Sequence, residues 1–447
     1  MTAAARTLAE FAVGLKYEML PNAVVERAKT TIIDTVGAMT FGADLPWSRI
    51  IIEYVQRTSA PGRGSIVGTP HKARGQLAAL ANGALAHSFE LDSLCNPGVG
   101  FHPGAALTSP GIPVSQAQGR SGKDLLTAFV AGFEVTYRIG DAARSSSESI
   151  GFHAPGLTGV FGGAIVTGLL MNLDVERMTN ALGIAGSLCS GLLEFSRSGG
   201  GMVKRLHLGR AAESGALAAT LAREGFTGPQ SVLEGKFGFL AAFAKEREPE
   251  RLTRALGEEW HTLKTMLKRY ACHITAHVPV TAALELRTRH GFSGADVAAV
   301  TIRANEKVVS HHNITEPQDT TMAQYSTPFC VALALHRDPV DPTVFSDDSL
   351  NDASIRAVCR NTSVEELPAD KVKNRFSTYL AVRLRNGREH SIEMHDYEGM
   401  PHRPLSQEQL RAKFLKLTAR TQAYNPEAVF ARLEALEDQP TMTPLFD

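Results

Sequence analysis

Cysteine is scarce in this sequence. Five cysteines are spread over 447 residues, and no CxxC motif occurs. This pattern predicts neither a disulfide framework nor a thiolate zinc site. Unpaired thiols are typical of a reducing compartment, and the N-terminal stretch MTAAARTLAEF lacks the apolar core of a secretory signal. We therefore expect a cytoplasmic protein.

An excess of charge of either sign is also missing. Lys and Arg together number 46, as do Asp and Glu, so the formal net charge is zero. A nucleic-acid-binding protein usually carries a basic excess, and none is present here. A small anionic ligand stays compatible with this balance, because a local cluster can be positive within a neutral chain.

Long hydrophobic runs are missing as well. The longest uncharged stretch, residues 149–173, is long enough to cross a bilayer but contains His153, Pro155 and five glycines between residues 156 and 168. No basic flank would set an orientation. We expect a buried helix of a soluble core, in which Gly159 and Gly163 share one face and admit a neighbouring backbone.

The apolar pattern divides the chain into two kinds of structure. Up to about residue 265, apolar residues recur at helical spacing, and Ala and Gly are frequent, which favours tightly packed helices. Residues 297–304 are rich in β-branched side chains, and residues 380–394 alternate as a hairpin with a type I′ turn at Asn386-Gly387. We predict a mainly α protein: a large helical domain over 1–268, completed by 403–447, with an inserted α+β domain over 269–402.

The segment 90–104, ELDSLCNPGVGFHPG, carries carboxylates and an imidazole at a break between two helices. Glu90 and Asp92 end one helix, and His102 opens the next, with Pro103 in its first turn. Free backbone N–H groups at such a helix start attract anions. Ordinary capping by Asp92 and a turn histidine is the competing interpretation of this segment taken alone.

A glycine loop precedes a basic cluster at 196–215. Gly199, Gly200 and Gly201 come just before Lys204, Arg205 and His207. The phosphate-binding motif GxxxxGK[ST] is absent, so a phosphate cradle is not predicted. We expect a flexible loop that directs Lys204 into a cleft, where desolvation and Arg205 would suit it to proton transfer. A solvated loop lysine is the alternative.

Two further segments carry polar residues at helix junctions. His273 and His277 are four apart, but Ile274 stands where a zincin has glutamate, so a metal site is not predicted. Pro279 indicates that His277 ends a loop or begins a helix. Tyr325 precedes Pro328 and an apolar helix, where its hydroxyl is placed to bind a ligand oxygen or to pack in the core.

Together these segments resemble the MmgE/PrpD family, which includes 2-methylcitrate dehydratase, cis-aconitate decarboxylase and iminodisuccinate epimerase. The resemblance rests on ANGALAHSFELD…HPG, GFHAPGLTGVFG, VKRLHLGRAAESG, KRYACHITAH, AQYSTPF and PLSQEQLRAKF, which occur in this order over nearly the whole chain. It implies a helical domain with a smaller α+β lid, a homodimer, and no metal or organic cofactor.

The resemblance also implies a set of active-site residues and a cleft between the domains for a small di- or tricarboxylate. The catalytic residues would be Asp92, His102, His153, Lys204 and His277. The substrate-binding residues would be Arg205, His207, Lys268 and Tyr325. The implied chemistry removes or delivers a proton next to a carboxylate, with cations stabilising the carbanion.

One departure bears on the reaction. Dehydratases and decarboxylases of the family commonly have two adjacent aspartates, whereas this sequence has Asp92-Ser93. We predict a 2-methylcitrate dehydratase-like hydro-lyase, with an iminodisuccinate-type epimerase or a cis-aconitate decarboxylase-like lyase as alternatives. Because expelling hydroxide requires a general acid, the missing carboxylate favours the epimerase alternative. A carboxylate-binding protein without activity and a metallohydrolase built on His273 and His277 are further hypotheses.

Overall fold

The computed structural model describes residues 3–198 and 201–447. The chain forms two compact units. One consists of Met1–Ser88, Asp92–Leu267 and Ser406–Asp447, and the other of Phe89–Leu91 and Lys268–Leu405. The second unit therefore interrupts the sequence of the first.

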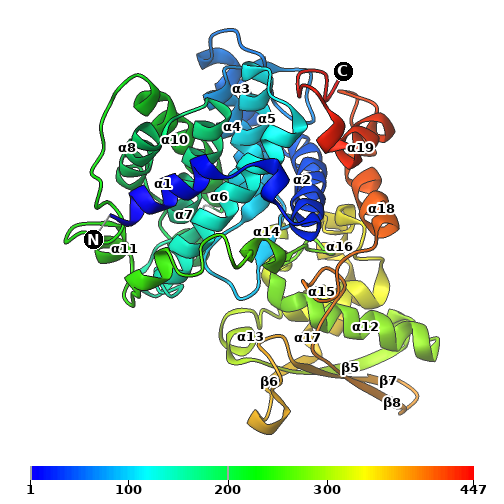
Figure 1. Cartoon of the computed structure of the whole chain (residues 1–447). Helices are drawn as coiled ribbons and strands as arrows, with labels where there is room; N and C mark the ends of the chain where they lie inside the picture. The colour runs from blue at the N-terminus through cyan, green and yellow to red at the C-terminus, as the bar shows by residue number, and fades with distance from the viewer. Residues whose placement is uncertain (1–2, 199–200) are drawn as a thin grey trace. The chain divides into compact units, whose positions relative to one another are not determined.

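The first unit is built almost entirely of helices (Figure 1). Its α-helices are α1 (Ala4–Gly14), α2 (Asn22–Ala43), α3 (Pro46–Thr58), α4 (Gly75–Ala86), α5 (Ser109–Gln118), α6 (Gly122–Ala142), α7 (Ala154–Leu170), α8 (Val175–Ser187), α9 (Phe195–Ser198), α10 (Met202–Arg223), α11 (Phe239–Phe243), α18 (Gln407–Thr418) and α19 (Pro426–Glu434). Two short antiparallel pairs join β1 (Gly64–Ser65) to β2 (Lys72–Ala73) and β3 (Leu94–Cys95) to β4 (Thr265–Met266).

Helices α4, α7 and α10 form the centre of this unit, and α10 packs against both of the others. Helix α7 is the uncharged run of the sequence, and nearly all of its residues are buried. A Cβ added at Gly159 would lie 3.2 Å from the Ala211 Cβ of α10, and one at Gly163 would lie 3.4 Å from the Ala211 carbonyl. The predicted close approach at these glycines is confirmed, and no described helix meets the length and hydropathy needed to cross a membrane.

The second unit combines a four-stranded sheet with helices. The strand order is β6 (Thr362–Glu366), β5 (Val297–Ala304), β7 (Thr378–Leu384), β8 (Glu389–Met394); β5 and β6 are parallel and the other neighbours antiparallel. Figure 1 shows α12 (His277–His290) running alongside this sheet, and it contacts β7 and β8. The other helices are α13 (Glu306–His311), α14 (Thr320–Tyr325), α15 (Thr327–His336), α16 (Asp347–Asn351) and α17 (Ala353–Arg360). The prediction of a mainly helical protein with a small sheet is confirmed.

The predicted hairpin is present, but its turn differs from the prediction. The ladder ends at the pair Arg383 and Glu389, and only Gly387 adopts a left-handed φ, of +85°. A type I′ turn requires positive φ at both central residues, and Asn386 does not have it. Instead, Asn386 Oδ1 accepts the Arg388 N–H at 3.0 Å, so the asparagine side chain holds a wider loop.

Candidate active site

Three side chains of the helical unit share one carboxylate oxygen. Asp92 Oδ2 lies 2.7 Å from His87 Nδ1 and 2.8 Å from His102 Nδ1. The two imidazole rings meet edge to face, with centroids 4.7 Å apart. The side chains of His87 and Asp92 are 1% exposed, whereas that of His102 is 11% exposed. His102 is therefore the member of the trio that is most accessible to a substrate.

The trio holds a carboxylate rather than a carboxylic acid. Burial by itself raises the pKa of Asp92, but the electrostatic attraction and hydrogen bonds of the His87 and His102 rings outweigh it and bring that pKa well below its usual range. Because an ionised Asp92 has no proton to donate, both imidazoles donate Nδ1–H to it. The proton-free nitrogen of neutral His102 is then Nε2, as proton transfer to or from a substrate requires.

The chain around His102 is fixed by Ser93. The Gly104 N–H donates to Ser93 Oγ at 3.0 Å, where the π-helical turn η2 (Gly104–Thr108) begins. A Cβ at residue 104 would lie 2.0 Å from Thr35 Oγ1, so only glycine fits there. The serine that replaces a second aspartate thus supplies a helix-start contact next to His102.

Lys204, Arg205 and His207 lie on a helix and not on a flexible loop. Helix α10 begins at Met202, so the flexible loop predicted to carry Lys204 is wrong at this position. All three side chains belong to buried residues. Gly199 and Gly200 of the predicted loop lie outside the described residues. Residues 202–208 include the good helix formers Met, Lys, Arg and Leu, and α10 packs against α4 and α7, so the helix begins earlier than the glycines suggest.

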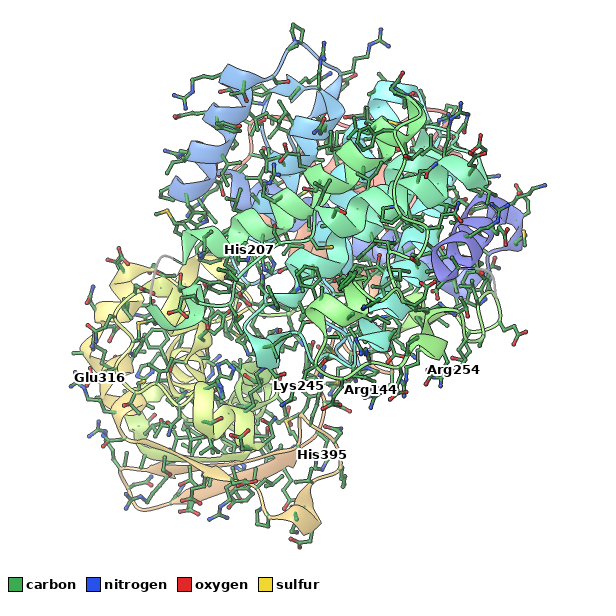
Figure 2. All side chains as sticks on the ribbon, turned by 90° about the vertical axis from the view of Figure 1, so that its left-hand side faces the viewer. Arg144, His207, Lys245, Arg254, Glu316 and His395 are labelled. Atoms are coloured by element: carbon green, nitrogen blue, oxygen red, sulfur yellow. The ribbon has the colours of Figure 1, made fainter. Side chains whose placement is uncertain are left out.

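His207 is paired with His153 across two helices. His153 is the residue just before α7, and its Nδ1 lies 3.0 Å from His207 Nδ1, so one ring donates and the other accepts. Burial lowers the pKa of both, and His87 lowers that of His153 further. Lys204 lowers the pKa of His207 and of His87, so its ammonium acts on both sets of imidazoles. Figure 2 labels His207 near the start of α10.

Arg205 makes contacts within the helical unit. Its Nε donates to the Ser88 carbonyl at 3.2 Å, and its guanidinium lies 4.8 Å from the Trp47 ring centroid. A further donor, Nη1, bonds the Gly201 carbonyl. These contacts tie the start of α10 to the end of α4, where His87 lies. Its predicted role in substrate binding stays a prediction.

The α+β unit contains a second group of polar side chains. Lys268 Nζ lies 2.6 Å from Glu90 Oε2, and the Tyr325 hydroxyl donates to Glu90 Oε1 at 3.2 Å. Lys268 and Glu90 are both buried. Glu90 has a φ of +57°, a conformation rare for a side chain with a Cβ and often retained at functional sites. Gln324 holds this arrangement by donating to the Phe89 carbonyl.

His273 and His277 occupy different environments. His277 begins α12 and is completely buried, with its ring 4.8 Å from that of Tyr397 and its Nε2 accepting the Tyr270 N–H at 3.4 Å. His273 is partly exposed, and its ring lies 5.0 Å from that of Tyr325. His273 therefore lies beside a predicted substrate-binding residue, whereas His277 is part of the packing.

Within its own unit, each group brings together residues from distant segments. The helical unit gathers Asp92, His102, His153, Lys204 and His207, and the α+β unit gathers Lys268 and Tyr325. The catalytic and substrate-binding residues predicted from the resemblance do not include His87, Glu90 or His273. His87 follows the last residue of α4, and only its separation of five residues from Asp92 indicates that the two side chains pair.

His87, Asp92 and His102 are also residue types that bind metal ions. Their ligand atoms all lie within 4.8 Å of one another, the one such group among the described residues. However, the 2.7 and 2.8 Å separations are those of N–H donors on an oxygen, and tetrahedral zinc ligands stand farther apart. The positive Lys204 nearby also opposes a cation. Hydrogen bonding accounts for this cluster.

Comparison with known proteins identifies the family of this chain. Residues 6–252 match the MmgE/PrpD N-terminal domain, and residues 270–439 match the MmgE/PrpD C-terminal domain. The chain belongs to the MmgE/PrpD family. The resemblance and the expectation of an MmgE/PrpD-type enzyme are confirmed at the level of this family.

Several relatives share a name within this family. The chain is 35% identical over 302 residues to a cis-aconitate decarboxylase of Aspergillus terreus, a match that covers 63% of this chain and 60% of the relative. It is 26% identical to the cis-aconitate decarboxylases of Mus musculus and Homo sapiens, over 97% of this chain and 91% and 92% of theirs. The match to the Aspergillus terreus protein thus spans less than two thirds of that relative.

Proposed function

We propose that this protein is a lyase that decarboxylates a small tricarboxylate of the cis-aconitate type. The observation that carries the proposal is the carboxylate-held imidazole of His102, with Lys204 close enough to act on the neighbouring imidazoles. The relatives named cis-aconitate decarboxylase support the choice of substrate.

The chemistry needs one proton and no redox partner. In cis-aconitate a CH₂ group links one carboxylate to a carbon–carbon double bond. When CO₂ leaves, its bonding electron pair forms a new double bond to the CH₂ carbon. The old double bond shifts its electrons onto the far carbon, which takes up a proton. One proton is consumed, and methylenesuccinate and CO₂ are formed.

We assign the proton delivery to His102. A proton on its Nε2 makes the ring a cation, and the Asp92 carboxylate 2.8 Å from Nδ1 stabilises that charge. Lys204 would stabilise the electron-rich carbon skeleton as CO₂ leaves. In the α+β unit, Lys268 and Tyr325 are proposed to bind substrate carboxylates, with Glu90 fixing both.

Dehydration of 2-methylcitrate is the second candidate, since it uses the same kind of proton transfer. It requires a general acid for the departing hydroxide. The position next to Asp92 holds Ser93, whose oxygen accepts the Gly104 N–H. This argument ranks dehydration below decarboxylation, which has no hydroxide to expel. Epimerisation of an iminodisuccinate-type compound is the third candidate.

The proposal is tested by NMR-monitored incubation with cis-aconitate, 2-methylcitrate and iminodisuccinate in D₂O. We expect CO₂ and methylenesuccinate carrying one deuterium at the newly saturated carbon. Water loss or stereochemical inversion would replace the proposal with the corresponding alternative. Tight binding by calorimetry without turnover of any compound would identify a binding protein instead.

The proposed reaction needs no metal ion or organic cofactor. We expect full activity after exhaustive chelation, with no stoichiometric zinc by elemental analysis. Loss of activity on chelation, restored by added metal, would contradict this and favour the metallohydrolase hypothesis. We further propose a homodimer, to be tested by light scattering coupled to gel filtration.

A further inference from the structure

His87 lies in the trio although no role has been given to it. It is the residue that ends α4, and its Nδ1 is 2.7 Å from Asp92 Oδ2, slightly closer than the 2.8 Å of His102. Its side chain is 1% exposed, so it is almost closed to substrate. Any effect of His87 on the reaction must therefore pass through Asp92.

The hydrogen bonds determine which nitrogen of His87 carries the proton. The ionised Asp92 can only accept, so His87 Nδ1 donates, and a neutral ring leaves Nε2 without hydrogen. His87 Nε2 is buried and has no hydrogen-bond partner among the residues that the structure describes. A second proton on this ring would therefore be buried without an acceptor, which is costly.

The groups around His87 also oppose a second proton. Burial lowers its pKa well below the ordinary value; Asp92 acts in the opposite direction, and Lys204 and His102 lower the pKa further. The His153 ring of α7 lies 5.7 Å from the His87 ring and is itself held neutral by burial. His87 is thus a fixed, neutral donor to Asp92.

We propose that His87 is a positioning residue that sets how strongly Asp92 supports a proton on His102. The inference rests on the proposed function in taking His102 as the proton-transfer group. The Nδ1–H groups of His87 and His102 both donate to Asp92 Oδ2. Each hydrogen bond stabilises the carboxylate charge and so weakens its effect on the other ring. Without the His87 donor, Asp92 would be more basic, and it would hold the His102 imidazolium to a higher pH.

The first measurement is the tautomeric state of the histidines in the wild-type protein. Imidazole ¹⁵N NMR, with signals assigned by single-histidine variants, distinguishes Nδ1–H from Nε2–H rings. We expect His87 and His102 to be Nδ1–H at neutral pH. An Nε2–H ring at His87, or a charged His87 at pH 7, would overturn the proposal.

The second measurement compares H87F with H87N. Phenylalanine fills the space but has no donor, whereas the asparagine amide nitrogen can occupy the place of Nδ1. In H87F we expect the pH at which His102 titrates to rise by roughly one unit, since a hydrogen bond to a charge is lost. The limb of the kcat/KM pH profile that reports His102 should move to higher pH by the same amount. H87N should bring both the NMR titration and the pH profile most of the way back to wild type.

A buried histidine elsewhere in the same unit provides the control. His261 stacks on Tyr137 with centroids 4.3 Å apart, and H261F should leave the titration of His102 unchanged. Unchanged titration of His102 in folded H87F, or an equal shift in H261F, would contradict a specific role. If H87F does not fold, the titration of His102 in H87N and the tautomers of the wild-type histidines still test the role of His87.

The titration is read without turnover, so the two proposals fail separately. If none of the three compounds reacts, the NMR shifts still test the coupling of His87 to His102. If cis-aconitate is decarboxylated but the pH profile of H87F matches the wild type, the proposed function stands and the role of His87 falls.

Discussion

Asp92 and Asp34 are both buried carboxylates of the helical unit, but their partners suit them to different tasks. Asp34 pairs with Lys413 at 2.5 Å, with side-chain exposures of 0% and 7%, and this pair joins α18 to α2. Asp92 instead has two imidazole partners, one of them partly exposed. A permanent ammonium partner gives a structural link, whereas an imidazole partner that can gain and lose a proton suits catalysis.

We therefore expect D92N to lose activity and D34N to lose stability. D92N keeps the size of the side chain but no longer orients both Nδ1–H groups, so kcat should fall by about 10²-fold or more. D34N removes the Asp34 charge beside the buried Lys413 and should cost about 3 kcal/mol or more of unfolding free energy. Rates of CO₂ release and thermal melts measure the two effects. A D34N enzyme that is folded but as inactive as D92N would contradict this division.

His273 and His277 present the same contrast in the α+β unit. His277 is completely buried beside Cys272 and Tyr397, with Nδ1 3.6 Å from the Cys272 sulfur. His273 lies between the rings of His312 and Tyr325, at 4.1 and 5.0 Å. The predicted catalytic role of His277 therefore has less structural support than a role for His273.

We expect H277A to lower the melting temperature and H273N to lower the turnover. Removing a completely buried ring leaves a cavity and unpaired polar neighbours, for a loss of about 2–4 kcal/mol. H273N removes a partly exposed imidazole, so its stability should stay within about 1 kcal/mol while kcat/KM falls about tenfold or more. Circular dichroism melts and steady-state kinetics separate the two. Normal kinetics in H273N would show that His273 is not catalytic, and the catalytic role would then belong to His277 or to neither histidine.

At the level of elements, α10 owes its position to glycine contacts on both sides. A Cβ at Gly209 would lie 2.6 Å from the Leu80 carbonyl oxygen of α4, and one at Gly215 would lie 2.6 Å from the Val160 carbonyl oxygen of α7. Backbone atoms cannot give way at such distances. These contacts set the spacing of α10 from its neighbours and hence the 3.0 Å contact between His207 and His153.

We expect G215A to reduce both stability and activity. The added methyl group must push α10 away from α7, at a cost of about 1–3 kcal/mol that outweighs the helix-propensity gain of up to about 1 kcal/mol. His207 would move with the helix, so kcat should fall as well. Gly14, at the end of α1, has open space around its Cβ position, and G14A should be neutral or slightly stabilising. Urea titrations compare the two, and equal stability would contradict the packing argument.

The elements that the sequence predicted well are those with a strong local pattern. The strand of residues 297–304 and the alternating hairpin within residues 380–394 are both present. The start of α10 was missed because Gly201 signals a loop, while the partners that stabilise the helix come from α4 and α7. His87 was missed for the same reason, since its importance arises from the oxygen that it shares with His102.

For the molecule as a whole, buried neutral histidines connect stability to pH. Burial is the largest cause that lowers the pKa of His261 to about 3 and of His312 to about 4. An unfolded histidine titrates near pH 6.5. Below that pH the unfolded chain binds protons that the folded protein does not. Stability from these groups is therefore complete above about pH 6.5 and declines as the pH falls toward 4.

We expect the free energy of unfolding to decrease steeply between pH 6.5 and 4.5 and H261F to flatten the decrease. Each excluded proton contributes a slope of up to about 1.4 kcal/mol per pH unit. His261 stacks on Tyr137, and its Nδ1 is buried without a partner among the described residues, so phenylalanine preserves the stacking and removes the titration. Urea titrations at several pH values should show that the unfolding free energy of H261F depends less on pH than that of the wild type, by the equivalent of up to about one proton. Burial also keeps His87 and His153 neutral. The same urea titrations on H87F would therefore show how much of the loss of unfolding free energy at low pH comes from His87.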